Sequence, residues 1–139
     1  MPNMKILSTL FFFALGILVN GQTQNIEEFL LRKENHEVMV AAHRGDWKNH
    51  PENSLSAIQS CIDHFLDIVE IDVQETSDGV FILMHDNTVN RTTNGKGKVS
   101  ALSSKQIAKL KLRDKNGVLT EEHVPTLKEA LQLAEGKIM

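Results

Sequence analysis

Short apolar runs alternate with amphipathic helical segments along most of this chain, and their order constrains the fold more than any other feature. Residues 38–42 are all apolar, as in a strand that is buried on both faces. Residues 55–65 carry apolar side chains at helical spacing, residues 68–74 alternate between apolar and polar side chains, and residues 80–84 form another apolar run. Because a strand is followed by a helix and then by further strands, the sequence predicts an α/β fold with a partly parallel sheet.

Capping boxes mark the start of two later helices. Ser103 is followed by Gln106 at the third helical position, and Thr126 is followed by Glu129 in the same way. In each pair the two side chains satisfy backbone N–H groups that have no partner within the helix. We expect the second of these helices to end at Gly136, and the last residues of the chain to begin another strand.

The dipeptide Asp78-Gly79 predicts a tight turn between the strands on either side of it. With a two-residue loop, Ser77 pairs with Val80, and Asp72 then lies opposite His85. Directly opposed residues of antiparallel strands share one face of the sheet. We therefore expect Asp72 and His85 to be neighbours.

Residues with catalytic chemistry gather at the predicted ends of strands. His43-Arg44-Gly45 directly follows the first apolar run. Glu70 and Asp72 lie on one side of the next strand, and His85-Asp86 follows the third. Functional residues of α/β folds lie at the carboxyl ends of strands, and this set of imidazoles, guanidinium and carboxylates suits a divalent cation and a phosphate ester. The spacing alone fits a solvent-exposed polar face equally well.

Residues 1–21 have the features of a signal peptide. Lys5 gives a positive start, residues 10–19 are apolar, and Val19-Asn20-Gly21 provides a small-residue cleavage site. A spanning helix needs about 20 apolar residues, which is more than this run supplies. The alternative is an uncleaved membrane anchor. We expect cleavage, no stable membrane insertion afterwards, and export to the periplasm or the extracellular space.

Charge and cysteine content limit the partners and the chemistry. Cleavage after residue 21 removes one of the 15 basic side chains and none of the 18 acidic ones, which leaves a net charge of −4. Such a chain gives no reason to expect nucleic acid or anionic lipid as a partner. Cys61 is the single cysteine, so no intrachain disulfide is possible, and its apolar helical surroundings predict a core residue.

Several motifs occur in an order and at a spacing that resembles the glycerophosphodiester phosphodiesterase family. They are His43-Arg44-Gly45, Pro51-Glu52-Asn53-Ser54, Glu70-Ile71-Asp72-Val73-Gln74, His85-Asp86 and the segment 91–97. The resemblance implies the N-terminal portion of a TIM (β/α)8 barrel over residues 22–139, with an insertion after the second strand at about residues 87–124. A complete barrel takes about 250 residues, so the barrel is expected to be incomplete in this chain.

The same resemblance implies a role for each candidate site residue. His43 and His85 resemble the acid–base pair of the family, and Arg44 resembles its phosphate-binding residue. Glu70 and Asp72 resemble the ligands of its divalent metal, Mg²⁺ or Ca²⁺. The sequence leaves open which histidine is the base, and whether the nucleophile is water or a neighbouring glycerol hydroxyl.

Neighbouring residues carry further expectations. Glu52 either contacts the metal or holds Arg44. Asn53 is expected to cap the following helix, and Trp47 either walls the substrate entrance or packs its own loop. The glycines of segment 91–97 do not form a phosphate-binding fingerprint, so this segment is expected to be structural.

By resemblance, the function is metal-dependent hydrolysis of small-molecule glycerophosphodiesters to glycerol phosphate and an alcohol. This chain by itself is expected to be an inactive N-terminal fragment of such an enzyme. The alternatives are a related phosphodiesterase like the sphingomyelinase D phospholipases, and a non-catalytic remnant or binding module. The segment 91–97 and the insertion favour the first interpretation.

Overall fold

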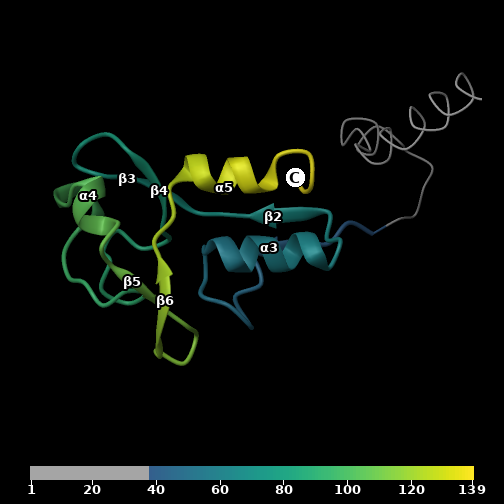
Figure 1. Cartoon of the computed structure of the whole chain (residues 1–139), viewed down its shortest axis with the longest axis horizontal. Helices are drawn as coiled ribbons and strands as arrows, with labels where there is room; N and C mark the ends of the chain where they lie inside the picture. The colour runs from purple at the N-terminus through teal and green to yellow at the C-terminus, as the bar shows by residue number, and fades with distance from the viewer. Residues whose placement is uncertain (1–37) are drawn as a thin grey trace, which may run out of the picture. The chain divides into compact units, whose positions relative to one another are not determined.

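The computed structural model describes residues 38–139 (Figure 1), and the predicted signal peptide at residues 1–21 lies outside them. Within residues 38–139, no helix is long and apolar enough to cross a membrane. In chain order the elements are β1 (Ala41–His43), α3 (Leu55–Asp63), β2 (Ile68–Glu70), β3 (Val73–Glu75), β4 (Phe81–Leu83), the 3₁₀ turn η1 (Val99–Ala101), α4 (Ser104–Ile107), β5 (Lys111–Arg113), β6 (Leu119–His123) and α5 (Leu127–Ala134).

Strands β1 and β2 are parallel and are joined through α3, as the sequence predicts. Their register sets His43 beside Glu70. The last residue bonds to β2 as well: the Met139 N–H donates to the Asp67 carbonyl at 3.2 Å, and its carbonyl accepts from the Val69 N–H at 2.7 Å. These two bonds have the pattern of a parallel ladder, which agrees with the strand expected at the end of the chain.

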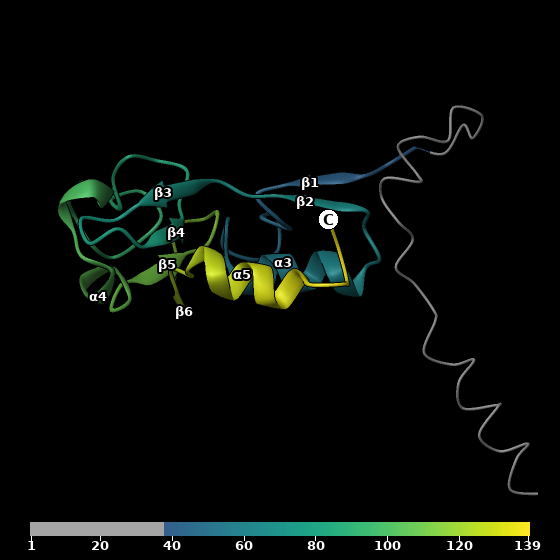
Figure 2. The ribbon, with the colours of Figure 1, turned by 90° about the horizontal axis from the view of Figure 1, so that it is seen from above.

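Helices α3 and α5 lie side by side on one face of β1 and β2 (Figure 2). Both predicted capping boxes are present, at the start of α4 and of α5. Ile58 of α3 and Ala130 of α5 are buried together with Leu83 of β4. Cys61 is fully buried in α3, which confirms its assignment to the core.

The residues from β4 to the start of α5 have a hydrophobic core of their own. Its buried members are Ile82, Met84, Val89, Val99, Ile107, Leu112 and Val124. Each of these side chains is at most 6% exposed, so this core is complete within the described part of the chain. It includes most of the predicted insertion, with η1, α4, β5 and β6 around it (Figure 1).

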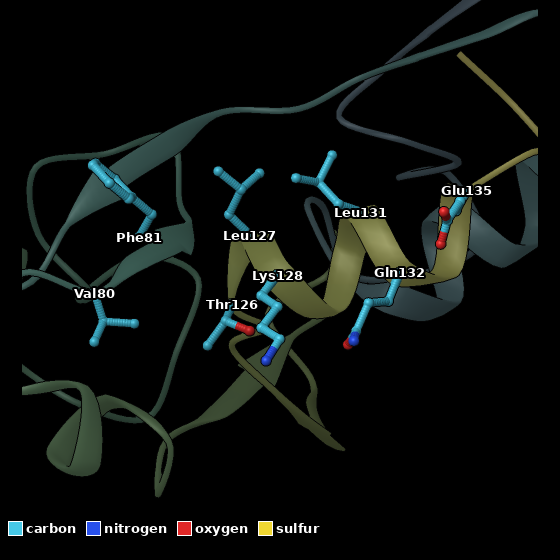
Figure 3. Close-up of a pocket in the computed structure, with 8 residues that line it drawn as sticks. All are labelled: Val80, Phe81, Thr126, Leu127, Lys128, Leu131, Gln132 and Glu135. Atoms are coloured by element: carbon cyan, nitrogen blue, oxygen red, sulfur yellow. The ribbon is translucent and has the colours of Figure 1, made fainter.

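The surface between β4 and α5 is not covered by other residues of the described chain. A hollow of about 710 Å³ lies between β4 and α5, flanked by apolar side chains of both elements (Figure 3). Phe81 and Leu131 at this hollow are 50% and 57% exposed. Residues 38–139 form a mixed α/β fragment and no closed barrel.

The β3–β4 hairpin forms as predicted, but its register differs by one residue. Thr76 pairs with Val80 through the Thr76 N–H, which donates to the Val80 carbonyl at 3.0 Å. The loop therefore has three residues and ends at Gly79, whose φ of +80° is the left-handed conformation that such loops require. The expected pairing of Ser77 with Val80 is wrong.

This register changes what lies opposite Asp72. The Met84 N–H donates to the Asp72 carbonyl at 3.0 Å, so Met84 takes the place predicted for His85. The loop is longer because the Asp78 carboxylate accepts bonds from the Thr76 hydroxyl at 2.6 Å and the Ser104 hydroxyl at 2.8 Å. These bonds fix Asp78 against the start of α4 and leave it unavailable for a two-residue turn.

Candidate active site

The segment after β1 makes a tight turn that brings two candidate site residues together. Arg44 and Gly45 have φ values of +58° and +74°, and the Arg44 N–H donates to Glu70 Oε2 at 3.0 Å. Gly45 packs against α3 so closely that a Cβ atom there would lie 2.8 Å from the Cβ of Ala57. Glycine is therefore required at this position for steric and conformational reasons.

The Arg44 guanidinium lies between two carboxylates. Its Nη1 donates to Glu52 Oε1 at 3.2 Å, and its Nε lies 3.3 Å from Asp72 Oδ2. The Arg44 Nε is buried and is not aligned for a hydrogen bond within residues 38–139, so its contact with Asp72 is electrostatic. Glu52 thus holds Arg44, which is one of the two roles expected for it.

Asn53 fixes Asp72 through a pair of reciprocal hydrogen bonds. Its Nδ2 donates to Asp72 Oδ2 at 2.9 Å, and its Oδ1 accepts from the Asp72 N–H at 3.0 Å. The Asp72 N–H thus bonds to a side chain at the break between β2 and β3, which the sequence predicted as one strand. The expectation that Asn53 caps α3 is wrong, because the Ser54 hydroxyl takes that role by accepting from the Ala57 N–H at 3.1 Å.

Sequence reasoning missed Arg91, which it placed in a structural segment. Its guanidinium donates to Glu52 at 2.7 and 2.8 Å and to Asp86 at 2.8 and 3.0 Å. These contacts lower the pKa of Glu52 and of Asp86 below their ordinary values and raise the pKa of Arg91. The signal in the sequence was Asp86, a carboxylate next to the candidate site residue His85 that had no assigned cation.

His85 is joined to this network through its neighbour. Its Nδ1 lies 2.7 Å from Asp86 Oδ1, so Nδ1 carries the proton that the Asp86 carboxylate accepts. A chain of contacts then runs from His85 through Asp86, Arg91 and Glu52 to Arg44. His43 is exposed at the end of β1, and no hydrogen bond within the described residues holds its ring.

The two predicted metal ligands offer carboxylate oxygens of the right kind. Glu70 uses Oε2 for the Arg44 N–H, and Asp72 uses Oδ2 for Asn53, which leaves the second oxygen of each unbonded within residues 38–139. Mg²⁺ is commonly held by one or two carboxylates together with water and substrate phosphate, so this donor set fits a divalent cation. No group of three or more His, Cys, Asp or Glu side chains in the described part of the chain forms a complete metal cage.

The family model and the similar proteins all point to one family. Residues 43–139 match the Glycerophosphoryl diester phosphodiesterase family. Glycerophosphodiester phosphodiesterase 1 of Mus musculus is 43% identical over 102 residues, which cover 71% of this chain and 31% of that protein. Glycerophosphodiester phosphodiesterase of Caldanaerobacter subterraneus is 43% identical over 100 residues, which cover 71% of this chain and 41% of that protein. The chain therefore spans less than half the length of these relatives.

Solved structures of the same kind superpose on the described fold. A glycerophosphoryl diester phosphodiesterase from Parabacteroides distasonis aligns with a TM-score of 0.67 and 37% identity, covering 73% of this chain and 36% of that one. An Oleispira antarctica phosphodiesterase, in complex with the product sn-glycerol-3-phosphate, aligns with a TM-score of 0.62 and 29% identity, covering 69% of this chain and 39% of that one. The chain corresponds to part of a TIM barrel in such structures.

Proposed function

Because the chain belongs to the glycerophosphoryl diester phosphodiesterase family, we propose that its active form hydrolyses glycerophosphodiesters to glycerol phosphate and an alcohol. The observation that carries this proposal is the Arg44 guanidinium, held between Glu52 and Asp72 beside Glu70. A preorganised guanidinium next to carboxylates of a cation site is suited to a phosphodiester anion. The product found in the Oleispira antarctica relative, sn-glycerol-3-phosphate, supports this choice of substrate.

In this mechanism, Arg44 binds and orients the phosphate through donors on a planar fork. Glu70 and Asp72 would hold Mg²⁺ or Ca²⁺, which when bound neutralises charge on the phosphate. Asn53 keeps Asp72 in place, since both its amide atoms are committed to that residue. The network therefore fixes the phosphate-binding side chains before substrate arrives.

The two histidines supply the proton transfers of the proposed reaction. Asp86 holds the Nδ1 proton of His85, so Nε2 is the atom that exchanges a proton with the substrate. His43 is the last residue of β1, lies beside Glu70 of β2, and is exposed. One histidine removes a proton from the nucleophile and the other protonates the leaving oxygen.

We further propose that the 139-residue chain is inactive by itself. It spans 31% to 41% of the length of the relatives described above, and a complete barrel takes about 250 residues. Export follows from the signal peptide proposed at residues 1–21 and is tested by determining the N-terminus of the mature protein. A non-catalytic remnant is the outcome if no longer form of the protein has activity.

The test compares the 139-residue chain with the longest protein that contains it. Release of glycerol phosphate from glycerophosphocholine is measured with Mg²⁺, with Ca²⁺ and with excess EDTA. We expect activity in the longer protein alone, its loss on chelation, and its loss in Glu70→Gln. Glu75→Gln is the matched control, because Glu75 is an exposed residue of β3 outside the network. Full activity in EDTA, or equal loss in both variants, would contradict the proposal.

A further inference from the structure

A second recess borders the candidate active site, and it has a chemical character of its own. It has a volume of about 320 Å³, near the lower limit of small-molecule sites. Its lining residues are Trp47, Glu52, Arg91, Thr92, Arg113, Asp114, Lys115 and Gly117. We propose that this recess is the subsite for the alcohol part of the phosphodiester, and that it takes a small uncharged alcohol with several hydroxyl groups. This inference rests on the function proposed above.

Its position follows from two shared residues. Glu52 and Arg91 line the recess, and Glu52 also contacts the Arg44 guanidinium at 3.2 Å. A substituent of a phosphodiester bound at Arg44 would reach the recess past Glu52, which contacts both Arg44 and Arg91. The insertion supplies the opposite wall through the turn between β5 and β6, which carries Asp114 and Lys115.

The preference for hydroxyl groups follows from which polar atoms are already used. Both oxygens of Glu52 accept bonds from Arg91, and Asp114 Oδ1 accepts from the N–H groups of Asn116 and Val118. The acidic side chains of the recess are thus occupied as acceptors. Arg91 is committed in the same way to Glu52 and Asp86, so the charged donors that remain are Arg113 Nη2 and the Lys115 ammonium, which form no bond within residues 38–139. A ligand here therefore gains most from oxygen atoms that accept hydrogen bonds.

The charge of the lining argues against a cationic alcohol. Arg113 donates to the carbonyls of Thr93 and Gly117, which are neutral and leave its charge uncompensated. Lys115 is exposed and forms no ion pair within residues 38–139. Of the lining side chains, Arg91, Arg113 and Lys115 are positive and Glu52 and Asp114 are negative, which leaves an excess of one positive charge. The ring of Trp47, which is 40% exposed, would by itself attract a quaternary ammonium, but Arg113 and Lys115 oppose it.

Trp47 makes the recess directly observable, because it is the single tryptophan of the chain. The 139-residue chain is titrated in Mg²⁺ with glycerophosphoglycerol and with glycerophosphocholine, while Trp47 emission is recorded. The two ligands are similar in size and differ in the charge of the alcohol. We expect glycerophosphoglycerol to bind about fivefold more tightly, as expected for one exposed charge contact, and sn-glycerol 3-phosphate to change the emission less than either diester.

Charge reversal in the recess provides the decisive comparison. Lys115→Glu is expected to abolish or reverse the preference for glycerophosphoglycerol. Lys109→Glu is the control, because Lys109 is an exposed lysine of the same insertion that does not line the recess. Equal affinity for both diesters, no emission change with either, or the same effect in both variants would overturn the proposal.

The outcome is separable from that of the proposed function, which is scored by release of glycerol phosphate. A charge-dependent preference without hydrolysis by any form of the protein would refute the phosphodiesterase function and keep the recess as a ligand site. Hydrolysis by the longer protein without such a preference in Trp47 emission would retain the function and reject the subsite.

Discussion

The strongest energetic prediction concerns Arg91, whose replacement by methionine keeps an unbranched apolar stem and removes the guanidinium with its charge. The Arg91 side chain is 48% exposed, while those of Glu52 and Asp86 are 18% and 28% exposed. Exposed ion pairs contribute about 0.2–1 kcal/mol each, and hydrogen bonds to charged groups about 1.5–3 kcal/mol. Because the guanidinium is half in water and Glu52 keeps Arg44, we expect Arg91→Met to lower the free energy of unfolding by about 1–2 kcal/mol at pH 7.

The pH dependence of this loss distinguishes charge from packing. Arg91 lowers the pKa of Glu52 and Asp86 in the folded state, so its stabilisation is present above their ordinary pKa values and is lost as the carboxylates are protonated. The difference between wild type and Arg91→Met should therefore shrink as the pH falls below about 4. Urea denaturation at pH 7 and pH 3 measures it, with Lys96→Met, an exposed change in the same segment, as control. A difference that is equal at both pH values, or equal to that of the control, would refute this reasoning.

Three further predictions concern the turn after β1 and the proton transfers. Gly45→Ala should lower the free energy of unfolding by about 2 kcal/mol or more in urea denaturation, because it adds a Cβ 2.8 Å from Ala57 in a left-handed backbone. In the longer protein, His43→Ala and His85→Ala should each lower kcat by about 10²-fold, and the double variant should be little worse than the worse single one. Normal turnover in either single variant would remove that histidine from the mechanism. Arg44→Lys should raise KM for the phosphodiester, since the ammonium keeps the charge but loses the planar fork; an unchanged KM would contradict its role.

Elements that depend on near neighbours in the chain were predictable. The capping boxes at Ser103 and Thr126 require a side chain and a backbone group within the same helical turn, and both are present. The parallel pairing of β1 with β2 follows from two apolar strands separated by a helix. The contact between Glu52 and Arg44 was one of two predicted roles, and eight residues of sequence separate them.

The hairpin register failed for a reason outside the local sequence. Asp78-Gly79 favours a two-residue turn by itself. In the folded chain, however, the Asp78 carboxylate accepts a hydrogen bond from the Ser104 hydroxyl, 26 residues away in the sequence, and this bond holds Asp78 in the longer loop. The Thr76 hydroxyl adds a second bond, and these contacts lower the pKa of Asp78 to about 2. A one-residue change of register moves each side chain to the other face, so the error removed the predicted pairing of His85 with Asp72.

No role was predicted for Arg91 from the sequence, although its contacts link the predicted insertion to the candidate site. Segment 91–97 was judged by its glycines, whereas its functional contacts depend on Glu52, which lies 39 residues earlier in the chain. A stronger argument was available: Asp86 adjoins the candidate site residue His85 and had no assigned cation, and a carboxylate that becomes partly buried requires one. Arg91 is that cation. Arg91 belongs to the predicted insertion and donates to Glu52, so separating this segment from the turn after β1 would break that ion pair, while Glu52 would keep Arg44 and Arg91 would keep Asp86. Arg91 thus links the predicted insertion to the candidate site, and the turn between β5 and β6 lines the recess that we propose for the alcohol of the substrate.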